Sequence, residues 1–400
     1  MSLRARFEAA HRALTTAAVT GTNGKTTTVS MIEAVVRASG EPSARLTTLG
    51  AWVCGQKVEG TNPTEEFLHC VEAAVRAEVR TLALEMTSKA LAAGIARRWP
   101  PRVGVFTNLS RDHLDMHGGP EAYLAAKAQL FVSLRHGGTA VLNADDPSSA
   151  LLADVMPPEV GILRYATSGA ADLRTTSVDV AVDGTRVAFA PSELGASLGE
   201  LRLRVHGDVH AQNAMACALA MHALGYAPSH IREGLEAFRT VAGRFEVIAT
   251  QPVVVVDYAH TPDGLRGTLR TARQLAGSRL ICVFGCGGER DQGKRPQMGA
   301  IAHVGADRVI VTSDNPRRED PEAIIAAIES GAKGEGASWE RVVDRRAAVE
   351  RALSFATADD VVVIAGKGHE TTQEIGDEVL PFSDAAVVRE IVSPSDLVSA

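Results

Sequence analysis

Short apolar runs that end in polar residues recur along the whole chain, and segments with apolar residues at helical spacing separate them. The runs are residues 81–84, 103–106, 140–142, 253–256, 280–284, 309–311 and 361–365. Buried parallel strands joined by crossover helices produce this alternation, and ligands bind such sheets at the carboxyl ends of the strands. The pattern predicts an α/β fold with two doubly wound, mainly parallel sheets.

The first apolar run, residues 17–19, leads into a loop with the sequence Gly21-Thr22-Asn23-Gly24-Lys25-Thr26-Thr27. Helical spacing follows from Val29 to Arg37. Backbone N–H groups at the glycines and the positive end of the helix dipole form an anion site, to which Lys25 adds a charge and Thr26 a hydroxyl for a metal. We therefore expect a nucleotide triphosphate here. The full phosphate-loop pattern has a glycine where Val19 stands, so the loop is a shortened version, and by itself it could be an ordinary turn.

Changes in the pattern of apolar and polar residues divide the chain into three parts. Residues 1–14 read as an N-terminal extension with one amphipathic helix, residues 15–241 as a central domain, and residues 242–400 as a C-terminal domain. Within the central domain, we expect a helix from Thr61 to about Ala77 with Thr64 as its possible cap. Alternating, turn-rich sequence at 172–205 predicts a small antiparallel addition, with helices at 209–224 and 231–238 after it.

The composition of the chain excludes several classes of function. A formal net charge of −7 and an aromatic content of 4% argue against a nucleic-acid surface. An odd number of cysteines, five, without metal-ligand spacing indicates reduced thiols in a cytoplasmic protein. We see no signal peptide and no run long enough to span a bilayer, so no membrane partner is expected.

The motifs together resemble the Mur ligases, ATP-dependent amino-acid ligases of peptidoglycan precursor synthesis, and most closely their diaminopimelate-adding members. The resemblance runs from about Val19 to Asp384. Besides the loop, it rests on residues 107–115 (TNLSRDHLD), 143–146 (NADD), 257–263 (DYAHTPD) and 314–317 (DNPR). It implies a central ATPase domain with a P-loop-type sheet, a Rossmann-like C-terminal domain, and ATP and Mg²⁺ as cofactors. ATP would phosphorylate a carboxylate, and an amine would attack the acyl phosphate.

The resemblance also assigns catalytic and metal-binding residues. Thr26 would hold one Mg²⁺ and Glu85 with His113 a second, while Lys127 matches the lysine that the family carbamylates. A carbamate is an anion that can help to hold metal, whereas a bare ammonium would be repelled. The alternatives are a surface carboxylate, a loop-packing histidine and a helix-surface lysine. Lys25 completes the catalytic set.

Further residues match nucleotide and amino-acid contacts. Asn213, Arg244, Asp257 and His260 match contacts to the adenine, ribose or phosphates, although Asp257 and His260 could be an internal hydrogen-bonded pair. For the incoming amino acid the matches are Arg290, Asp314, Asn315, Arg317, Gly366 and Glu370. A guanidinium such as that of Arg317 can hold a carboxylate in bidentate fashion, while Glu370 and Asp314 would hold an ammonium. The alternative is that Arg317 only solvates a loop.

Two departures concern the acceptor. Only 20 residues precede Gly21, where the family has a uridine-nucleotide-binding domain, so we expect that domain to be missing. The acceptor-side motifs, which contain Thr61 and Thr87 as candidate contacts, differ from the family pattern, and Ile95 stands where an arginine is expected. The resulting hypothesis is a ligase for meso-diaminopimelate or a similar amino acid, acting on a carboxylate-bearing peptide or acyl acceptor.

Three other functions stay open. The acceptor could be a UDP-linked molecule held by a separate acceptor-binding protein. The enzyme could also serve specialised metabolism or polyglutamylation with a different acceptor. A nucleotide-binding subunit without catalysis is the non-enzyme alternative, which would predict the loss of Lys25, Glu85, His113 or Lys127.

Overall fold

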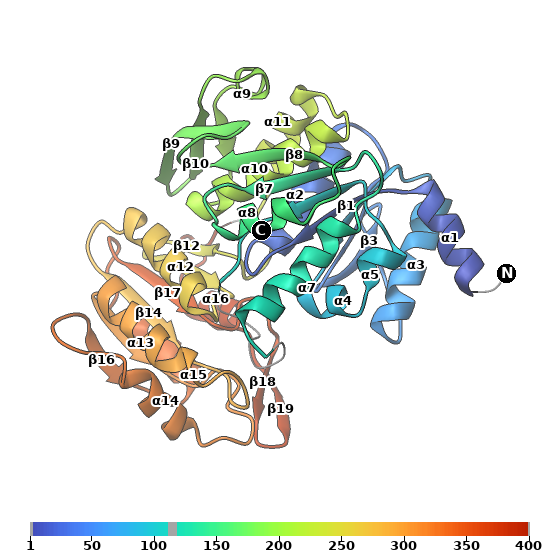
Figure 1. The fold of residues 1–400 in the computed structure, drawn as a ribbon. Coiled ribbons are helices and arrows are strands. Elements are labelled where there is room, and N and C mark those ends of the chain that lie inside the picture. The colour runs from blue at the N-terminus through green and yellow to red at the C-terminus, as the bar shows by residue number, and fades with distance from the viewer. Residues whose placement is uncertain (1–2, 111–117, 399–400) are drawn as a thin grey trace. The chain divides into compact units, whose positions relative to one another are not determined.

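The computed structural model describes residues 3–110 and 118–398, and the chain forms two compact units (Figure 1). The first unit contains residues 3–110, 118–179 and 184–239, and the second contains residues 180–183 and 240–398. Each unit is built around one large sheet. The predicted fold class, two doubly wound and mainly parallel sheets, is confirmed.

The sheet of the first unit has the strand order β11-β10-β9-β8-β7-β6-β1-β5-β2-β3-β4 in the described residues. The strands are β1 (Thr15–Thr20), β2 (Ala44–Thr47), β3 (Gly50–Val53), β4 (Gln56–Val58), β5 (Thr81–Glu85), β6 (Val103–Phe106), β7 (Thr139–Asn143), β8 (Gly161–Ala166), β9 (Leu173–Ala181), β10 (Gly184–Phe189) and β11 (Leu201–Leu203). The strands from β2 to β9 in this order are parallel, with β1 between β5 and β6. The carboxyl ends of these strands therefore meet at one edge.

The helices of this unit are α1 (Leu3–Ala13), α2 (Lys25–Ala38), α3 (Pro63–Arg76), α4 (Ser88–Ala92), α5 (Ile95–Arg98), α7 (Pro120–Val132), α8 (Ser148–Asp154), α9 (Glu193–Leu198), α10 (Asp208–Ala223) and α11 (Pro228–Ala237). Helices α2, α10 and α11 pack together on one face of the sheet, while α3, α4, α5 and α7 lie on the other (Figure 1). The second face has a core that includes Ala18, Leu82, Trp99, Phe106 and Phe131. Burial on both faces explains why β1, β5 and β6 read as continuous apolar runs.

One local prediction needed correction. The helix after Thr61 begins at Pro63, and its cap is Asn62 rather than Thr64: the Asn62 side chain accepts hydrogen bonds from the N–H groups of Thr64 and Glu65. Asparagine is a strong N-cap because its oxygen reaches these free N–H groups from an extended backbone. The predicted antiparallel addition at 172–205 contains the antiparallel pair β10–β11, and β9 joins it to the main sheet by pairing in parallel with β8.

The second unit has a sheet with the order β12-β13-β17-β14-β15-β16, in which β12 alone runs antiparallel to its neighbour among the described strands. The strands are β12 (Glu246–Thr250), β13 (Val253–Asp257), β14 (Leu280–Phe284), β15 (Arg308–Val311), β16 (Ser338–Arg341) and β17 (Val361–Ala365), with a separate hairpin of β18 (Thr372–Ile375) and β19 (Glu378–Pro381). The helices are α12 (Pro262–Leu275), α13 (Lys294–Gly305), α14 (Pro321–Glu329), α15 (Arg345–Phe355) and α16 (Asp384–Ile391).

Alternate residues of these strands enter two separate cores. Val255, Cys282 and Val363 pack in the core that contains residues of α12, α13 and α14. Val254, Val283 and Val362 point the other way, into the core that contains residues of α15 and α16. Side chains alternate across a strand, so both faces of this sheet must be apolar when helices cover each of them. The loops at the carboxyl edge are therefore held by buried strands on both sides.

Candidate functional site

The loop between β1 and α2 has a backbone that requires glycine at two positions. Gly21 has a φ of 150° and Gly24 a φ of 84°. A Cβ atom at Gly21 would collide with the side-chain oxygen of Thr107, and one at Gly24 with Oδ1 of Asn213. The absence of side chains there lets neighbouring elements approach the loop at the N-terminus of α2, where the helix dipole favours an anion.

Side chains from the end of β6 hold this loop in place. Oδ1 of Asn108 accepts a hydrogen bond from the N–H of Asn23 at 2.9 Å, and the hydroxyl of Thr107 donates to the carbonyl of Asn23 at 2.6 Å. Within the loop, Nζ of Lys25 donates to the carbonyl of Thr22 at 2.7 Å. Thr27 is buried at the start of α2. The loop is thus preorganised, with the ammonium of Lys25 kept beside it.

Asn213 of α10 reaches the same loop from another helix. Its side chain is 3% exposed, and Nδ2 has no hydrogen-bond partner in the described residues. A buried amide N–H without a partner costs free energy, about 1–3 kcal/mol, unless something accepts its hydrogen bond. An acceptor atom of a ligand on the loop would supply that partner.

Thr26 and Glu85 form the second part of the site. The Thr26 hydroxyl, in the first turn of α2, donates to Oε2 of Glu85 at 2.8 Å. Glu85 ends β5 and is 6% exposed, and Thr48 also contacts its carboxylate through the backbone N–H at 3.3 Å. Thr26 and Thr48, its partners in the described residues, are both uncharged. They therefore provide no counter-charge for the buried carboxylate. A hydroxyl and a carboxylate are ligands that Mg²⁺ prefers, and the pair fits such an ion.

Lys127 points at the loop from α7. It is fully buried, Nζ donates to the carbonyl of Gly21 at 2.7 Å, and the same nitrogen lies 4.2 Å from the ring centroid of Tyr123. The helix-surface alternative for Lys127 is therefore wrong. His113, the remaining predicted metal ligand, lies outside the described residues. No group of three or more His, Cys, Asp or Glu side chains that could hold a metal is found among the described residues.

The Asn143–Asp146 motif supports the loop rather than lining it. Nδ2 of Asn143 donates to the carbonyl of Thr107 at 2.7 Å, and Oδ2 of Asp146 accepts from the N–H of Leu109 at 2.6 Å. Asp145 accepts from the N–H and hydroxyl of Thr167. The motif thus fixes the segment after β6, which in turn fixes Asn23.

Asp257, at the end of β13 in the second unit, is used internally. Its carboxylate accepts hydrogen bonds from the N–H of Phe245 at 2.6 Å, from the N–H of Ala259 at 3.0 Å and from the hydroxyl of Thr268 at 2.7 Å. Nδ1 of His260 lies 2.8 Å from the carbonyl of Tyr258. The predicted alternative of an Asp257–His260 pair does not match these contacts.

Arg244 belongs to an aromatic cluster above this edge. Its guanidinium carbon lies 4.2 Å from the ring centroid of Tyr258, which contacts the rings of His260 and His369 at centroid distances of 4.5 and 5.1 Å. Nε of Arg244 and Nδ1 of His369 are buried and have no hydrogen-bond partner in the described residues. Burial lowers the pKa of His369, and the charge of Arg244 lowers it further, against the opposing effect of Glu370. The cluster therefore holds a cation next to a neutral imidazole.

A buried polar network connects the loops after β15 and β17. Asn315 donates from Nδ2 to Oε2 of Glu370 at 2.9 Å, and Lys367 donates to Oδ1 of Asn315 at 2.9 Å and to Oε2 of Glu370 at 2.8 Å. Lys367 is fully buried. Burial acts to raise the pKa of Glu370, but the hydrogen bond and charge of Lys367 outweigh it, so that the pKa is lowered. Glu370 is therefore an anion with a fixed position.

Asp314 and Gly366 adjoin this network. A Cβ at Gly366, whose φ is 117°, would collide with Oδ2 of Asp314. Asp314 is 8% exposed, and burial raises its pKa despite the nearby charges of Arg345 and Lys367. Asp314, Asn315, Gly366 and Glu370 thus meet at one edge.

Arg317 is held from two sides. Its Nε lies 2.7 Å from Oε2 of Glu374 on β18, and NH1 donates to the carbonyl of Gly288 at 2.8 Å. Its backbone has a φ of 52° and bridges in parallel to Ile375. A guanidinium that only solvates a loop would not be fixed in this way. Arg290 is exposed on the loop after β14.

Thr61 and Thr87 are the candidate acceptor contacts, and no hydrogen bond in the described residues connects them. Thr61 is exposed and its hydroxyl donates to Glu65, while the hydroxyl of Thr87 caps α4 by accepting from the N–H of Ala90 at 3.2 Å. Both threonines therefore have local structural roles.

Sequence reasoning missed four residues of these sites: Thr48, Tyr258, Lys367 and His369. Three of them stand inside motifs that were singled out, in residues 257–260 and 366–370. Each of these three residues is next in sequence to one that was predicted to belong to a site, and this position could have identified it. Thr48 had no such signal, because the β2–β3 turn brings it to Glu85.

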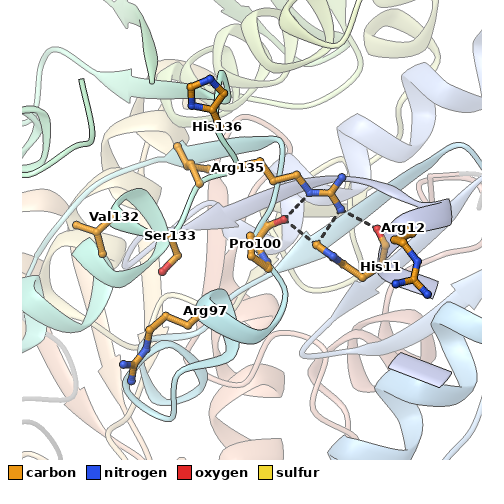
Figure 2. Close-up of a pocket in the computed structure, with 9 residues that line it drawn as sticks. His11, Arg12, Arg97, Pro100, Val132, Ser133, Arg135 and His136 are labelled. Atoms are coloured by element: carbon orange, nitrogen blue, oxygen red, sulfur yellow. Dashed lines mark hydrogen bonds between the residues drawn. The ribbon is translucent and has the colours of Figure 1, made fainter. Parts of the chain in front are cut away.

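One surface hollow lies elsewhere in the first unit. It has a volume of about 590 Å³ and is lined by residues of α1, α5 and α7 and the segments that follow them (Figure 2). None of the predicted site residues lines it. In the part of the chain that the structure describes, no helix is long and apolar enough to cross a membrane.

Comparisons with known proteins agree with this arrangement. Residues 19–221 match the model of the Mur ligase middle domain, and residues 243–368 match that of the Mur ligase glutamate ligase domain. Two relatives carry the name UDP-N-acetylmuramoyl-L-alanyl-D-glutamate–2,6-diaminopimelate ligase. The protein of Xanthomonas campestris pv. campestris is 42% identical over 385 residues, and that of Halalkalibacterium halodurans is 39% identical over 382. Each match covers 94% of this chain and 77% of the relative.

Solved structures are similar as well. A UDP-N-acetylmuramoyl-L-alanyl-D-glutamate–2,6-diaminopimelate ligase matches with a TM-score of 0.66 and 35% identity, over 94% of this chain and 78% of that one. Folylpolyglutamate synthase of Mycobacterium tuberculosis, complexed with ADP and AMPPCP, matches with a TM-score of 0.71 at 21% identity, over 91% and 92%. The second likeness shows the fold alone.

Proposed function

The chain belongs to the Mur ligase family, and from this premise we propose that it joins meso-diaminopimelate, or a similar amino acid, to a carboxylate-bearing peptide acceptor at the expense of ATP. The γ-phosphoryl group of ATP passes to the acceptor carboxylate, giving ADP and an acyl phosphate. The amine of the amino acid then attacks the carbonyl carbon, phosphate leaves, and the nitrogen loses a proton. The product is an amide.

The observation that carries the amino-acid assignment is the network at the carboxyl edge of the second sheet. Glu370 is held as an anion by Lys367 and Asn315, and Arg317 is fixed by Glu374 and Gly288. A carboxylate suits an ammonium, and a guanidinium suits a carboxylate. Opposite charges in fixed positions match an amino acid whose side chain carries its own ammonium and carboxylate.

ATP is proposed to bind the loop that follows β1. The positive-φ glycines place the loop at the N-terminus of α2, whose dipole favours phosphate oxygens, and Lys25 adds a charge beside it. Asn213 would supply its unpartnered amide to the nucleotide. The nucleotide roles of Arg244, Asp257 and His260 stay predictions, and the internal bonds of Asp257 leave it the weakest of the three.

Mg²⁺ is proposed to bind Thr26 and Glu85, with Lys127 as a carbamate and His113 completing its surroundings. Magnesium would neutralise charge that builds up on the transferred phosphoryl group. The chain's own contribution is to keep Glu85 buried at the end of β5, and to hold Lys127 against the carbonyl of Gly21.

The acceptor is the open part of the proposal. Thr61 and Thr87 make local bonds, which gives no support to their predicted acceptor contacts. A UDP-linked dipeptide, a free peptide and another acid therefore remain to be compared, and a separate acceptor-binding protein would be one way to hold the first.

The test is phosphate release by the purified protein with ATP and Mg²⁺, over a panel of amino acids and acceptors. The panel contains meso-diaminopimelate, lysine and glutamate, each with a UDP-muramoyl dipeptide, the free dipeptide or no acceptor. We expect release that needs both diaminopimelate and an acceptor. Release with glutamate alone among the amino acids would favour polyglutamylation, and no release with any pair would contradict the ligase.

A substitution in the phosphate loop distinguishes turnover by this protein from turnover by a contaminating enzyme. Lys25→Ala is expected to abolish phosphate release, because it removes the charge beside the phosphates. Lys89→Ala removes an exposed lysine of α4 in the same unit and serves as the matched control, which should keep wild-type activity. Unchanged product formation by Lys25→Ala would remove the loop from the mechanism.

A further inference from the structure

The hollow of the first unit lies at the opposite edge of the sheet from the phosphate loop. Arg135 and His136 precede β7, Pro100 precedes β6, and His11 precedes β1, so that all lie at the amino ends of parallel strands. The phosphate loop follows the carboxyl end of β1. A strand of six residues rises about 20 Å, which separates the two places.

The lining of the hollow is rich in cations. It contains Arg12, Arg97 and Arg135 together with His11 and His136, and no carboxylate. Among the described residues, Glu159 pairs with the lining, since its Oε1 lies 3.6 Å from Nδ1 of the exposed His136. The chain as a whole has a formal charge of −7, so this concentration of positive charge does not reflect composition.

Arg135 is fixed at the centre of the hollow by uncharged partners. Its Nε donates to the carbonyl of Pro100 at 3.0 Å, and NH2 donates to the carbonyl of His11 at 2.7 Å (Figure 2). NH2 also donates to the carbonyl of Leu14 at 3.4 Å. Nε2 of His11 lies 2.8 Å from NH2 of the same guanidinium. These bonds orient the guanidinium but do not neutralise it.

Both groups lie where burial disfavours a positive charge. Burial lowers the pKa of Arg135, and the charge of Arg102 lowers it further. Burial also lowers the pKa of His11, with a further contribution from Arg135 against the opposing carbonyl of Pro100. In addition, Oγ of Ser133, which lines the hollow, is buried and has no hydrogen-bond partner in the described part of the chain.

We propose that this hollow is a second anion site, for a small molecule or ion that carries phosphate groups. Guanidinium groups bind phosphate in bidentate fashion, and the volume of about 590 Å³ is in the range of small-molecule sites. Arg12 of α1 and Arg97 of α5 are exposed and lie on different sides of Arg135 (Figure 2). The site is independent of the ligase reaction and of the nucleotide on the phosphate loop.

The experiment measures pyrophosphate binding by isothermal titration calorimetry while a non-hydrolysable ATP analogue saturates the phosphate loop. We expect one additional site in 150 mM KCl. The double variant Arg12→Gln/Arg97→Gln should weaken it at least tenfold, as the loss of charge-assisted hydrogen bonds implies. Both arginines are exposed, so these substitutions leave the fold intact even if Arg135→Gln does not.

Arg98→Gln is the matched control. Arg98 is the neighbour of Arg97 on α5, it is exposed, and its guanidinium donates to the carbonyls of Ala93 and Gly94 outside the hollow. It should leave binding unchanged. Equal weakening by this control, or binding that has no stoichiometry and disappears in 150 mM KCl, would overturn the proposal.

Further titrations identify the source of the phosphate. Inorganic phosphate, pyrophosphate and a second equivalent of the ATP analogue are compared, and the tightest of them names the class of ligand. An acidic polyglutamate peptide that binds more tightly than all three would contradict a phosphate site. Failure of ligase activity has no bearing on this result, since binding is read without turnover.

Discussion

Glu374 on β18 places Oε2 2.7 Å from Nε of Arg317, in the loop that follows β15. The backbones of the two residues are also joined, because the N–H of Arg317 donates to the carbonyl of Glu374 at 3.1 Å. The hairpin of β18 and β19 therefore determines the orientation of the guanidinium. With Nε and one hydrogen of NH1 used, the end of the guanidinium remains for a bidentate carboxylate.

We predict that Glu374→Ala raises the KM for a diamino dicarboxylic acid about tenfold and changes kcat little, because the guanidinium loses its fixed direction. Glu378→Ala, on the paired strand β19, removes an exposed carboxylate from the same hairpin and should leave KM unchanged. Steady-state kinetics with varied amino acid measure both. A fall in KM would mean instead that Glu374 competes with the substrate.

Glu85→Gln is expected to raise the Mg²⁺ concentration needed for half-maximal phosphate release by about tenfold or more, because it removes the charge of a buried ligand. Thr26→Val should act in the same direction. Thr28→Val changes a buried threonine two residues along α2, and it should leave the Mg²⁺ dependence unaltered. An unchanged requirement in Glu85→Gln would exclude Glu85 from the metal site.

Carbamylation of Lys127 predicts that activity depends on dissolved CO₂. Protein prepared without CO₂ should be less active and should recover on addition of bicarbonate. Lys127→Arg keeps the positive charge but cannot form the carbamate, so it should be inactive with or without bicarbonate. Full activity of this variant would show that the ammonium contacting Gly21 suffices.

The lowered pKa of His369 predicts that the stability of the second unit depends on pH. Burial and Arg244 lower its pKa in the folded state, so the unfolded chain binds the proton more readily. The free energy of unfolding should therefore fall as pH drops below about 6.5, the ordinary value of histidine, and be insensitive to this group above it. Hydrogen exchange of the β13 and β17 amides between pH 7.5 and 5.5 measures this.

Three variants test the assignment. His369→Gln should flatten the profile, and Arg244→Gln should reduce its slope in part, since the second-largest cause of the shift is removed. Glu370 opposes both effects, so Glu370→Gln should steepen the profile. A wild-type slope in His369→Gln would show that another group titrates.

The sequence by itself determined the two sheets and the edge at which their polar loops lie. Runs such as residues 253–256 and 361–365 are apolar at every position, because both faces of a parallel sheet are covered by helices, and this leaves a readable pattern. The phosphate loop could also be predicted from the sequence, because a local structural requirement fixes its residues. The backbone at Gly21 and Gly24 needs glycine, so the local chain encodes the conformation.

Only the tertiary structure decided which side chains face one another. Thr26 and Glu85 are 59 positions apart, and Lys127 lies 106 positions from Gly21, so no local pattern links them. The same holds for Glu374 and Arg317, and for the three arginines that line the hollow from three segments of the chain. Periodicity encodes which face of an element is buried, whereas long-range contacts depend on the register and crossing of whole elements, which the packing of the complete core sets.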